Sequence, residues 1–239
     1  WVGAIGLLWM LRGSFRPERP PSRTSLRREI GEGIRFLVDR PLLRSMAIMV
    51  GMANLASSAT GAVLVLFAVG DESTLGLTSS QFGLLLLVSA AGSIAATFAV
   101  EGLVRSLGRS RTLTLAVIGM TFFVGAPAVT TNIWIIAASM LVGGFMVMLW
   151  NIPTVSFRQS VTPDHLLGRL NSVYRLLAWG TLPLGAALGG LLAEWLGLRA
   201  VFAIMGVVSL GLLVPNLTIT DQRLDEAEAR ADRERARIT

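Results

Sequence analysis

The chain has 239 residues, of which 53% are hydrophobic and only 15% carry a charge. Soluble domains carry roughly a quarter charged residues, so this composition excludes an ordinary soluble domain and indicates an integral membrane protein. The net charge is +6, and every basic residue is an arginine. We do not expect nucleic acid binding, because the arginines separate apolar stretches and form no basic surface with interleaved aromatic residues.

Metal and catalytic chemistry have little support in the composition. The chain has no cysteine and a single histidine, His165, which leaves no thiolate ligands and too few imidazoles for a zinc site. There is no G-x-S-x-G sequence and no recognisable pair of nucleophile and base. We therefore expect no metal site, no cofactor and no enzyme activity.

The first residues are apolar, and a basic stretch follows them. Residues 1–11 are too few to cross a bilayer, so we interpret them as the end of a preceding transmembrane helix and the chain as a piece of a longer protein. Nine of the 21 basic residues lie between positions 12 and 44. Because arginine-rich segments between spans stay in the cytoplasm, we expect residues 12–41 to form a cytoplasmic central loop.

The second part of this loop has helical periodicity. Apolar residues recur every three or four positions from Leu26 to Val38, with arginine and glutamate between them. The pattern predicts an amphipathic helix over residues 25–38 that ends before Pro41. Its apolar face could lie in the lipid headgroups or pack on the cytoplasmic face of the protein, and the sequence leaves both possibilities open.

Six long apolar windows fill residues 42–217. Each has the roughly 20 residues that a helix needs to cross a bilayer, and backbone in lipid must satisfy its hydrogen bonds within the segment. We therefore predict an all-α membrane protein with a six-helix transmembrane bundle. The windows are 42–69, 81–104, 112–130, 133–155, 172–195 and 199–217.

The connections between the windows alternate in charge. Residues 71–80 and 130–132 contain no arginine, whereas the loops expected at 101–111 and 157–175 contain three arginines each. Basic connections stay inside, so we expect a multi-pass protein of the bacterial inner membrane with a cytoplasmic C-terminus. The last segment, 218–239, is expected to be a charged cytoplasmic tail. We expect it to be a solvated, fraying helix or disordered rather than an element that binds a partner.

Two spans contain uncharged polar residues that are candidates for a substrate pathway. Asn54, Ser57 and Ser58 share one face of the first span. In the fourth span Asn151 lies just before a proline, with Met148 one turn earlier as a further candidate. These side chains could hydrogen-bond neighbouring helices or line a substrate cavity. No ionisable residue, the usual mark of a proton relay, lies at mid-depth in any window.

The fifth span combines a proline with small residues. Gly185 and Gly189 form a small-xxx-small face that permits close helix approach, and Pro183 and Gly190 flank it. We assign these four residues to helix packing, with a possible role as a hinge.

The order of a basic loop, six spans and a charged tail resembles the C-terminal half of a twelve-span transporter of the major facilitator superfamily. Residues 29–44 and the region 158–190 are similar to an efflux branch that includes enterobactin exporters and macrolide efflux proteins. The cytoplasmic motif of that family is G-x-L-x-D-R-x-G-R-R/K. Here Leu103, Gly108 and Arg109 match it, whereas Glu101 replaces the first glycine and Arg105 the aspartate.

A latch built on the missing aspartate is therefore not expected. We assign the motif to Leu103, Arg105, Gly108, Arg109 and Arg111, and we expect Arg105 to help hold the cytoplasmic side.

The resemblance implies a secondary active transporter, a proton-coupled exporter of small amphipathic molecules of the drug, macrolide or siderophore type that works by alternating access. Its cavity would be lined by the first and fourth of these spans. Its partners would be the small-molecule substrate, the lipid bilayer and the missing N-terminal half. No proton-carrying carboxylate is visible here, so it would lie in that half.

Two alternatives remain. The sequence Asp164-His165-Leu166-Leu167-Gly168 faintly resembles the loop that permease subunits of ATP-binding-cassette transporters offer to their ATPase. A non-transporting membrane scaffold is the other. Energy source separates the first alternative from the exporter, because a proton-driven transporter survives ATP depletion and fails with a protonophore.

Overall fold

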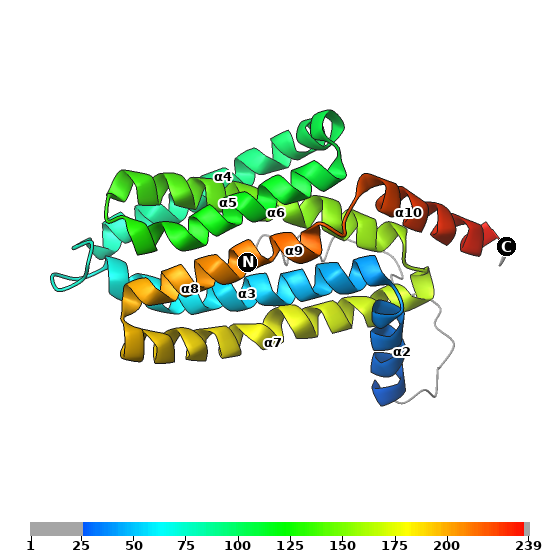
Figure 1. Ribbon diagram of the computed structural model, residues 1–239, viewed down its shortest axis with the longest axis horizontal. Coiled ribbons are helices and arrows are strands. Elements are labelled where there is room, and N and C mark those ends of the chain that lie inside the picture. Colours follow the sequence, from blue (N-terminus) through cyan, green and yellow to red (C-terminus); the bar gives the residue numbers. More distant parts are fainter. Residues whose placement is uncertain (1–25, 237–239) are drawn as a thin grey trace, which may run out of the picture.

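The computed structural model describes residues 26–236, which fold into a bundle of long helices with a short helix across one end (Figure 1). The expectations for residues 1–11 and for the start of the central loop lie outside the described residues. The helices are α2 (Leu26–Val38), α3 (Pro41–Ala68), α4 (Ser79–Leu107), α5 (Arg109–Val129), α6 (Ile133–Ser160), α7 (Asp164–Leu196), α8 (Leu198–Gly211), α9 (Leu213–Asn216) and α10 (Asp221–Ala236).

Six helical segments of the described chain are long and apolar enough to cross a membrane. They are α3, α4, α5, α6, α7 and the continuous pair α8–α9, and they correspond one to one with the six apolar windows. The prediction of an all-α, six-helix transmembrane bundle is confirmed. Large apolar side chains such as Phe98, Val129 and Trp134 are at least 80% exposed on the outside, as expected of a surface that lies in lipid.

The bundle consists of two groups of three helices. In one group α3 packs along α7 and α8, and in the other α6 packs along α4 and α5. The groups are joined mainly where α5 lies against α8, and there Gly125 and Gly206 let the two backbones approach closely. An edge-to-face contact between Phe67 and Phe202, with ring centroids 5.1 Å apart, helps to hold α3 against α8.

One end of the bundle carries α2, α10 and the α4–α5 and α6–α7 connections, and we call it the arginine-rich end (Figure 1). The prediction of long loops there, at 101–111 and 157–175, was wrong. The connections are the single residue Gly108 and residues 161–163. The helices continue past their apolar windows, so that Arg105, Arg109, Arg158 and Arg169 lie on helical turns.

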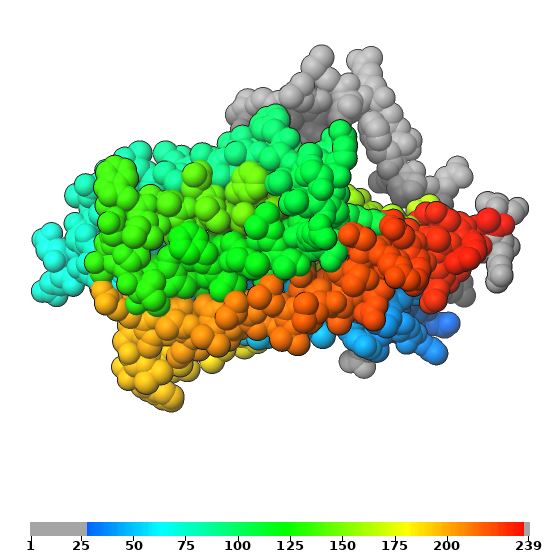
Figure 2. All heavy atoms as spheres, turned by 45° about the horizontal axis from the view of Figure 1, so that its top comes forward, coloured from blue at the N-terminus to red at the C-terminus, as the bar shows by residue number. Residues whose placement is uncertain are grey.

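The tail was expected to be a solvated, fraying helix or disordered; it is helical and largely exposed, but one face of it packs on the bundle. Residues 221–236 form α10, which lies against the arginine-rich end beside α2 and the start of α3 (Figure 2). Leu224 and Ala231 lie two turns apart on one face of α10 and are 1% and 8% exposed, with Ala227 packed between them. This narrow apolar stripe is sufficient to dock α10, because charged side chains of the same helix also form ion pairs with the rest of the protein.

Candidate functional site

A cavity of about 160 Å³ lies between α3, α5, α6 and α8 and is partly open, since its lining residues Ser57 and Asn151 are exposed. Its polar lining comes from Asn54 and Ser57 of α3, Asn151 of α6 and Ser209 of α8. The lining contains no ionisable side chain. Its apolar walls are Val50, Ala53, Val117, Met120, Phe123, Val124, Val147, Trp150 and Leu212.

The α3 candidates take part in helix packing as well as in the cavity. The side-chain amide of Asn54 donates to the backbone carbonyl of Ala178 in α7 at 3.1 Å. Ser58 donates to the carbonyl of Leu182 at 2.7 Å and is not part of the cavity lining. The sequence left open whether these residues hydrogen-bond neighbouring helices or line a cavity. Ser58 does the first, and Asn54 does both.

Ser57 and the α6 candidates are placed differently. Ser57 also lines a second cavity of about 100 Å³ between α3, α5, α6 and α8, together with Thr60 and Ser139. Asn151 donates only to its own helix, to the carbonyl of Val147 at 2.9 Å. Met148 is half-buried and lies outside both cavity linings.

The walls from α5 and α8 were missed by the sequence reasoning. Met120, Phe123 and Ser209 give no local signal, because they belong to ordinary apolar windows. Only the packing of α5 and α8 against α3 and α6 brings them to the polar residues.

The glycines of α7 differ sharply in their surroundings. A Cβ atom on Gly185 would lie 2.4 Å from the carbonyl oxygen of Leu55, and one on Gly189 would lie 2.3 Å from that of Ala59. Both glycines thus let α7 contact the α3 backbone directly. Gly190 was grouped with them, but nothing lies within 4 Å of its Cβ position. Pro183 is exposed, and α7 continues through it.

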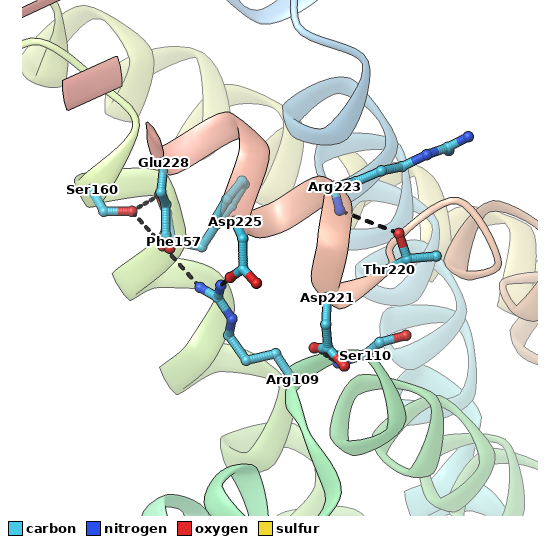
Figure 3. A network of polar contacts seen from close by, with 9 residues as sticks. All are labelled: Arg109, Ser110, Phe157, Ser160, Thr220, Asp221, Arg223, Asp225 and Glu228. Atoms are coloured by element: carbon cyan, nitrogen blue, oxygen red, sulfur yellow. Dashed lines mark hydrogen bonds and ion pairs between the residues drawn. The ribbon is translucent and has the colours of Figure 1, made fainter. Parts of the chain in front are cut away.

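At the arginine-rich end, Arg109 connects the bundle to α10 (Figure 3). Its Nη1 donates to Oε1 of Glu228 at 2.8 Å, and its Nη2 pairs with Asp225 one turn earlier in α10. Ser160, the last residue of α6, donates to the same Glu228 oxygen at 2.9 Å. One carboxylate therefore joins the ends of α5 and α6.

The neighbours of Arg109 complete this contact. The backbone N–H of Ser110 donates to Oδ1 of Asp221 at 2.9 Å, and its hydroxyl donates to the carbonyl of Ile219 at 2.7 Å. Asp221 thus binds a free donor of the first turn of α5. Gly108 has φ +83°, and a Cβ there would lie 2.7 Å from the second oxygen of Asp221.

The other motif residues differ in their relation to α10: Gly108 lies against Asp221, whereas Arg105 has its partner within α4. Arg105 pairs with Glu101 at 2.6 Å within α4, and both side chains are more than 75% exposed. Arg111 is exposed, and Leu103 packs on the hydrophobic core. In the described part of the chain, the motif residue that forms ion pairs with the tail is therefore Arg109, and Gly108 lets the tail approach closely.

Helix α2 packs on the protein and leaves an apolar stripe exposed. Arg169 of α7 pairs with Glu29 at 3.7 Å and with Glu32. Gly33 lies against the backbone of Arg169, where a Cβ would be 2.9 Å from the carbonyl oxygen. Beside this packed face a stripe of Ile30, Ile34 and Val38 is 42–47% exposed.

Comparisons with known proteins agree with this architecture. The sequence profile of the Major Facilitator Superfamily matches residues 46–238. An uncharacterised MFS-type transporter, y4rN of Sinorhizobium fredii (strain NBRC 101917 / NGR234), is 30% identical over 205 residues, which cover 85% of this chain and 50% of that protein. The multidrug efflux pump Tap of Mycolicibacterium fortuitum is 26% identical over 223 residues, covering 84% of this chain and 52% of the pump.

No solved structure matches the chain significantly. The chain spans about half the length of the curated relatives it matches. The family profile covers most of the sequence, and the described residues contain six helices that are long and apolar enough to cross a membrane. The chain therefore belongs to the major facilitator superfamily.

Proposed function

We propose that this chain is one half of a secondary active transporter that exports small amphipathic molecules by alternating access and is driven by the proton gradient. The observation that carries the proposal is the cavity in which Asn54, Ser57 and Asn151 meet apolar walls. Small-molecule sites commonly combine apolar walls with a few placed polar groups. A relative that matches most of this chain is named a multidrug efflux pump.

The lining favours amphipathic substrates. Two side-chain amides and two hydroxyls can donate or accept hydrogen bonds, while Met120, Phe123 and Trp150 offer apolar contact. Because these side chains include no carboxylate, they offer a cationic substrate no charge partner. A substrate would therefore be recognised here by its apolar body and its hydrogen-bonding groups, with any charge bound elsewhere in the full transporter.

Coupling to protons requires a group that this cavity lacks. Intramembrane carboxylates and histidines are the usual proton carriers. In the described spans these groups lie at or near helix ends: Glu101 in α4, and Asp164, His165 and Glu194 in α7. We place the proton-carrying group in the other half of the transporter.

The proposal is tested with the full-length transporter in inverted membrane vesicles, using a fluorescent dye as the substrate. Transport should continue after ATP depletion and stop when a protonophore is added. The opposite pattern would contradict proton coupling and favour an ATP-driven permease. Absence of transport of every amphipathic dye tested, by protein that is correctly inserted, would contradict the export function itself.

A matched pair of variants tests the cavity. Asn151→Leu replaces a lining amide with an apolar group and should change the ranking of transported dyes. Met148→Leu changes the same helix at nearly constant volume outside the cavity lining and should leave the ranking as in the wild type. An unchanged ranking for Asn151→Leu, Asn54→Leu and Ser57→Ala would show that the cavity is not the substrate site.

A further inference from the structure

A third and larger cavity lies at the arginine-rich end and takes no part in the proposed transport pathway. It has a volume of about 650 Å³ and opens between the α2–α3 elbow, the end of α6 and the inner side of α10. Four arginines and three acids line it: Arg40, Arg44, Arg223, Arg230, Asp39, Glu226 and Glu234. We call this cavity the elbow groove.

Two of the acids in the elbow groove already have cationic partners. Glu234 of α10 pairs with Arg40 at 3.3 Å, and the guanidinium of Arg40 also stacks on the ring of Phe36. Asp39 pairs with Arg35, a residue outside the groove, at 3.8 Å. The Arg40–Glu234 pair holds the α2–α3 elbow to α10. Glu226 is the remaining carboxylate in the lining of the groove.

The other three arginines have no carboxylate within 4 Å in the part of the chain that the structure describes. Arg44 donates to the backbone carbonyl of Val38 at 3.1 Å, and Arg223 donates to that of Thr218 at 3.1 Å. Glu226 is hydrogen-bonded to the amide of Gln222 at 2.8 Å. Three guanidinium groups from two separate elements therefore face a shared space with one carboxylate.

The floor of the elbow groove is apolar. Pro41 and Leu42 of α3 and Ala227 of α10 give it accessible apolar surface, next to the buried side chains of Leu43, Phe157 and Val161. The arginines lie around this floor on α3 and α10. An occupant that matches both parts has an anionic group at one end and an apolar portion at the other.

The position of α2 suggests the depth of the elbow groove. This helix crosses the end of the bundle (Figure 1) and leads directly into the elbow at Asp39 and Arg40. Its stripe of Ile30, Ile34 and Val38 borders the face packed on the protein and remains 42–47% exposed. An apolar stripe on a helix with a charged opposite face is typical of the boundary between headgroups and acyl chains. The groove would then lie at the level of lipid headgroups.

We propose that the elbow groove binds the phosphate group of an amphipathic anion through Arg44, Arg223 and Arg230, with the apolar part of the ligand on Pro41, Leu42 and Ala227. Guanidinium groups match phosphate oxygens in geometry and bind them with paired hydrogen bonds. The phosphate can belong to an anionic phospholipid or to a soluble phosphate ester. The depth suggested by α2 favours the phospholipid, since basic pockets at the membrane surface bind lipid headgroups.

The test measures binding of short-chain lipids to the full-length transporter in a neutral detergent. Dioctanoyl phosphatidylglycerol, dioctanoyl phosphatidylcholine and inorganic phosphate are titrated separately, and the dissociation constants are obtained by native mass spectrometry or calorimetry. Phosphatidylglycerol should bind at least about tenfold more tightly than phosphatidylcholine, a difference of about 1.4 kcal/mol. Equal binding of the two lipids overturns the proposal.

A variant pair of equal charge locates the site. Arg44→Gln/Arg223→Gln/Arg230→Gln should weaken phosphatidylglycerol binding by about tenfold or more. The control, Arg105→Gln/Arg111→Gln/Arg233→Gln, removes three exposed arginines outside the groove lining and should change binding less than about twofold, since exposed charges contribute little. Equal loss in both triple variants means general charge attraction and overturns the site.

The phosphate titration separates the two sources. Tight binding of inorganic phosphate that is lost only in the groove variant supports the phosphate site and assigns it to a soluble ester. Weak phosphate binding beside tight phosphatidylglycerol binding supports the lipid. Because the readout is binding and not transport, a negative result here leaves the proposed export function untouched.

Discussion

Arg109 at the start of α5 donates to Glu228 of α10, with Nη1 2.8 Å from Oε1, although the two residues are 119 positions apart. Asp225, one turn earlier in α10, pairs with the same guanidinium. Arg109 matches the second arginine position of the family motif, whose acidic position is Arg105 in this chain. In this chain the tail helix therefore supplies carboxylates at the α4–α5 connection.

The first prediction concerns the docking of α10. Arg109→Ala should weaken docking by about 2 kcal/mol, because hydrogen bonds to charged groups contribute about 1.5–3 kcal/mol each and this side chain is partly exposed. Amide hydrogen exchange in α10 should then accelerate by roughly thirtyfold. The measurement is hydrogen exchange mass spectrometry on the full-length transporter.

The control for this prediction is Arg105→Ala on the adjacent helix end. Its pair with Glu101 lies within one helix and is exposed, and such i,i+4 pairs contribute about 0.3–0.5 kcal/mol. Exchange in α10 should not change in this variant. If Arg105→Ala released α10 as strongly as Arg109→Ala, the docking would depend on the charge of this end and not on the Arg109 contacts.

The second prediction concerns the contact between α7 and α3. Gly189→Ala should lower the stability of the bundle by about 1–3 kcal/mol, because its Cβ would overlap the carbonyl oxygen of Ala59 at 2.3 Å. Gly190→Ala, one residue further on, meets nothing within 4 Å and should be neutral or stabilising by up to about 1 kcal/mol. Thermal unfolding of the purified full-length transporter compares the two. Equal unfolding temperatures would mean that α7 does not contact α3 at this glycine.

Much of the fold could be predicted from the sequence because each span is a local property. Twenty or so apolar residues in lipid must form a helix, wherever the neighbours lie. The connections were predicted less well, since Gly108 ends one helix and begins the next through its positive φ, and arginine-rich turns of helix have the same composition as loops. Hydropathy measures the membrane depth of a residue and not its backbone conformation.

The tail and the cavity walls could not be predicted for a different reason. Alternating arginines and carboxylates in residues 221–236 are typical of a solvated helix, and their partners, Arg109 and Arg40, lie more than 100 residues away. Ser209 and Met120 likewise have no pattern of their own. Asn54 was found because an amide in an apolar span is unusual, but its bond to Ala178 depends on the packing of α7.

The third prediction separates structure from substrate recognition in the central cavity. Asn54→Leu removes the bond to Ala178 and should destabilise the bundle by about 1 kcal/mol, a typical value for a hydrogen bond between membrane helices. Asn151→Leu removes only a bond within α6 and should leave the unfolding temperature unchanged. Both variants should insert normally and alter substrate resistance. Unchanged resistance in both would make the two asparagines structural residues.

The fourth prediction concerns the packing of α2 against α7. Gly33→Ala should displace this helix from α7, because its Cβ would lie 2.9 Å from the carbonyl oxygen of Arg169 and 3.1 Å from Cγ2 of Val173. A displaced α2 also loses the pairing of Glu29 and Glu32 with Arg169. Overpacking of this kind typically costs about 1–3 kcal/mol, so hydrogen exchange in α2 should accelerate by about tenfold or more.

The matched control is Gly31→Ala, two residues earlier in the same helix. Its Cβ would meet nothing within 4 Å, and alanine is favoured over glycine in a helix interior by about 1 kcal/mol. Exchange in α2 should therefore slow in Gly31→Ala while it accelerates in Gly33→Ala. Opposite signs from two chemically identical substitutions can only come from the contact with α7. If both variants slowed exchange, helix propensity alone would determine the stability of α2, and its packing against Arg169 would contribute nothing.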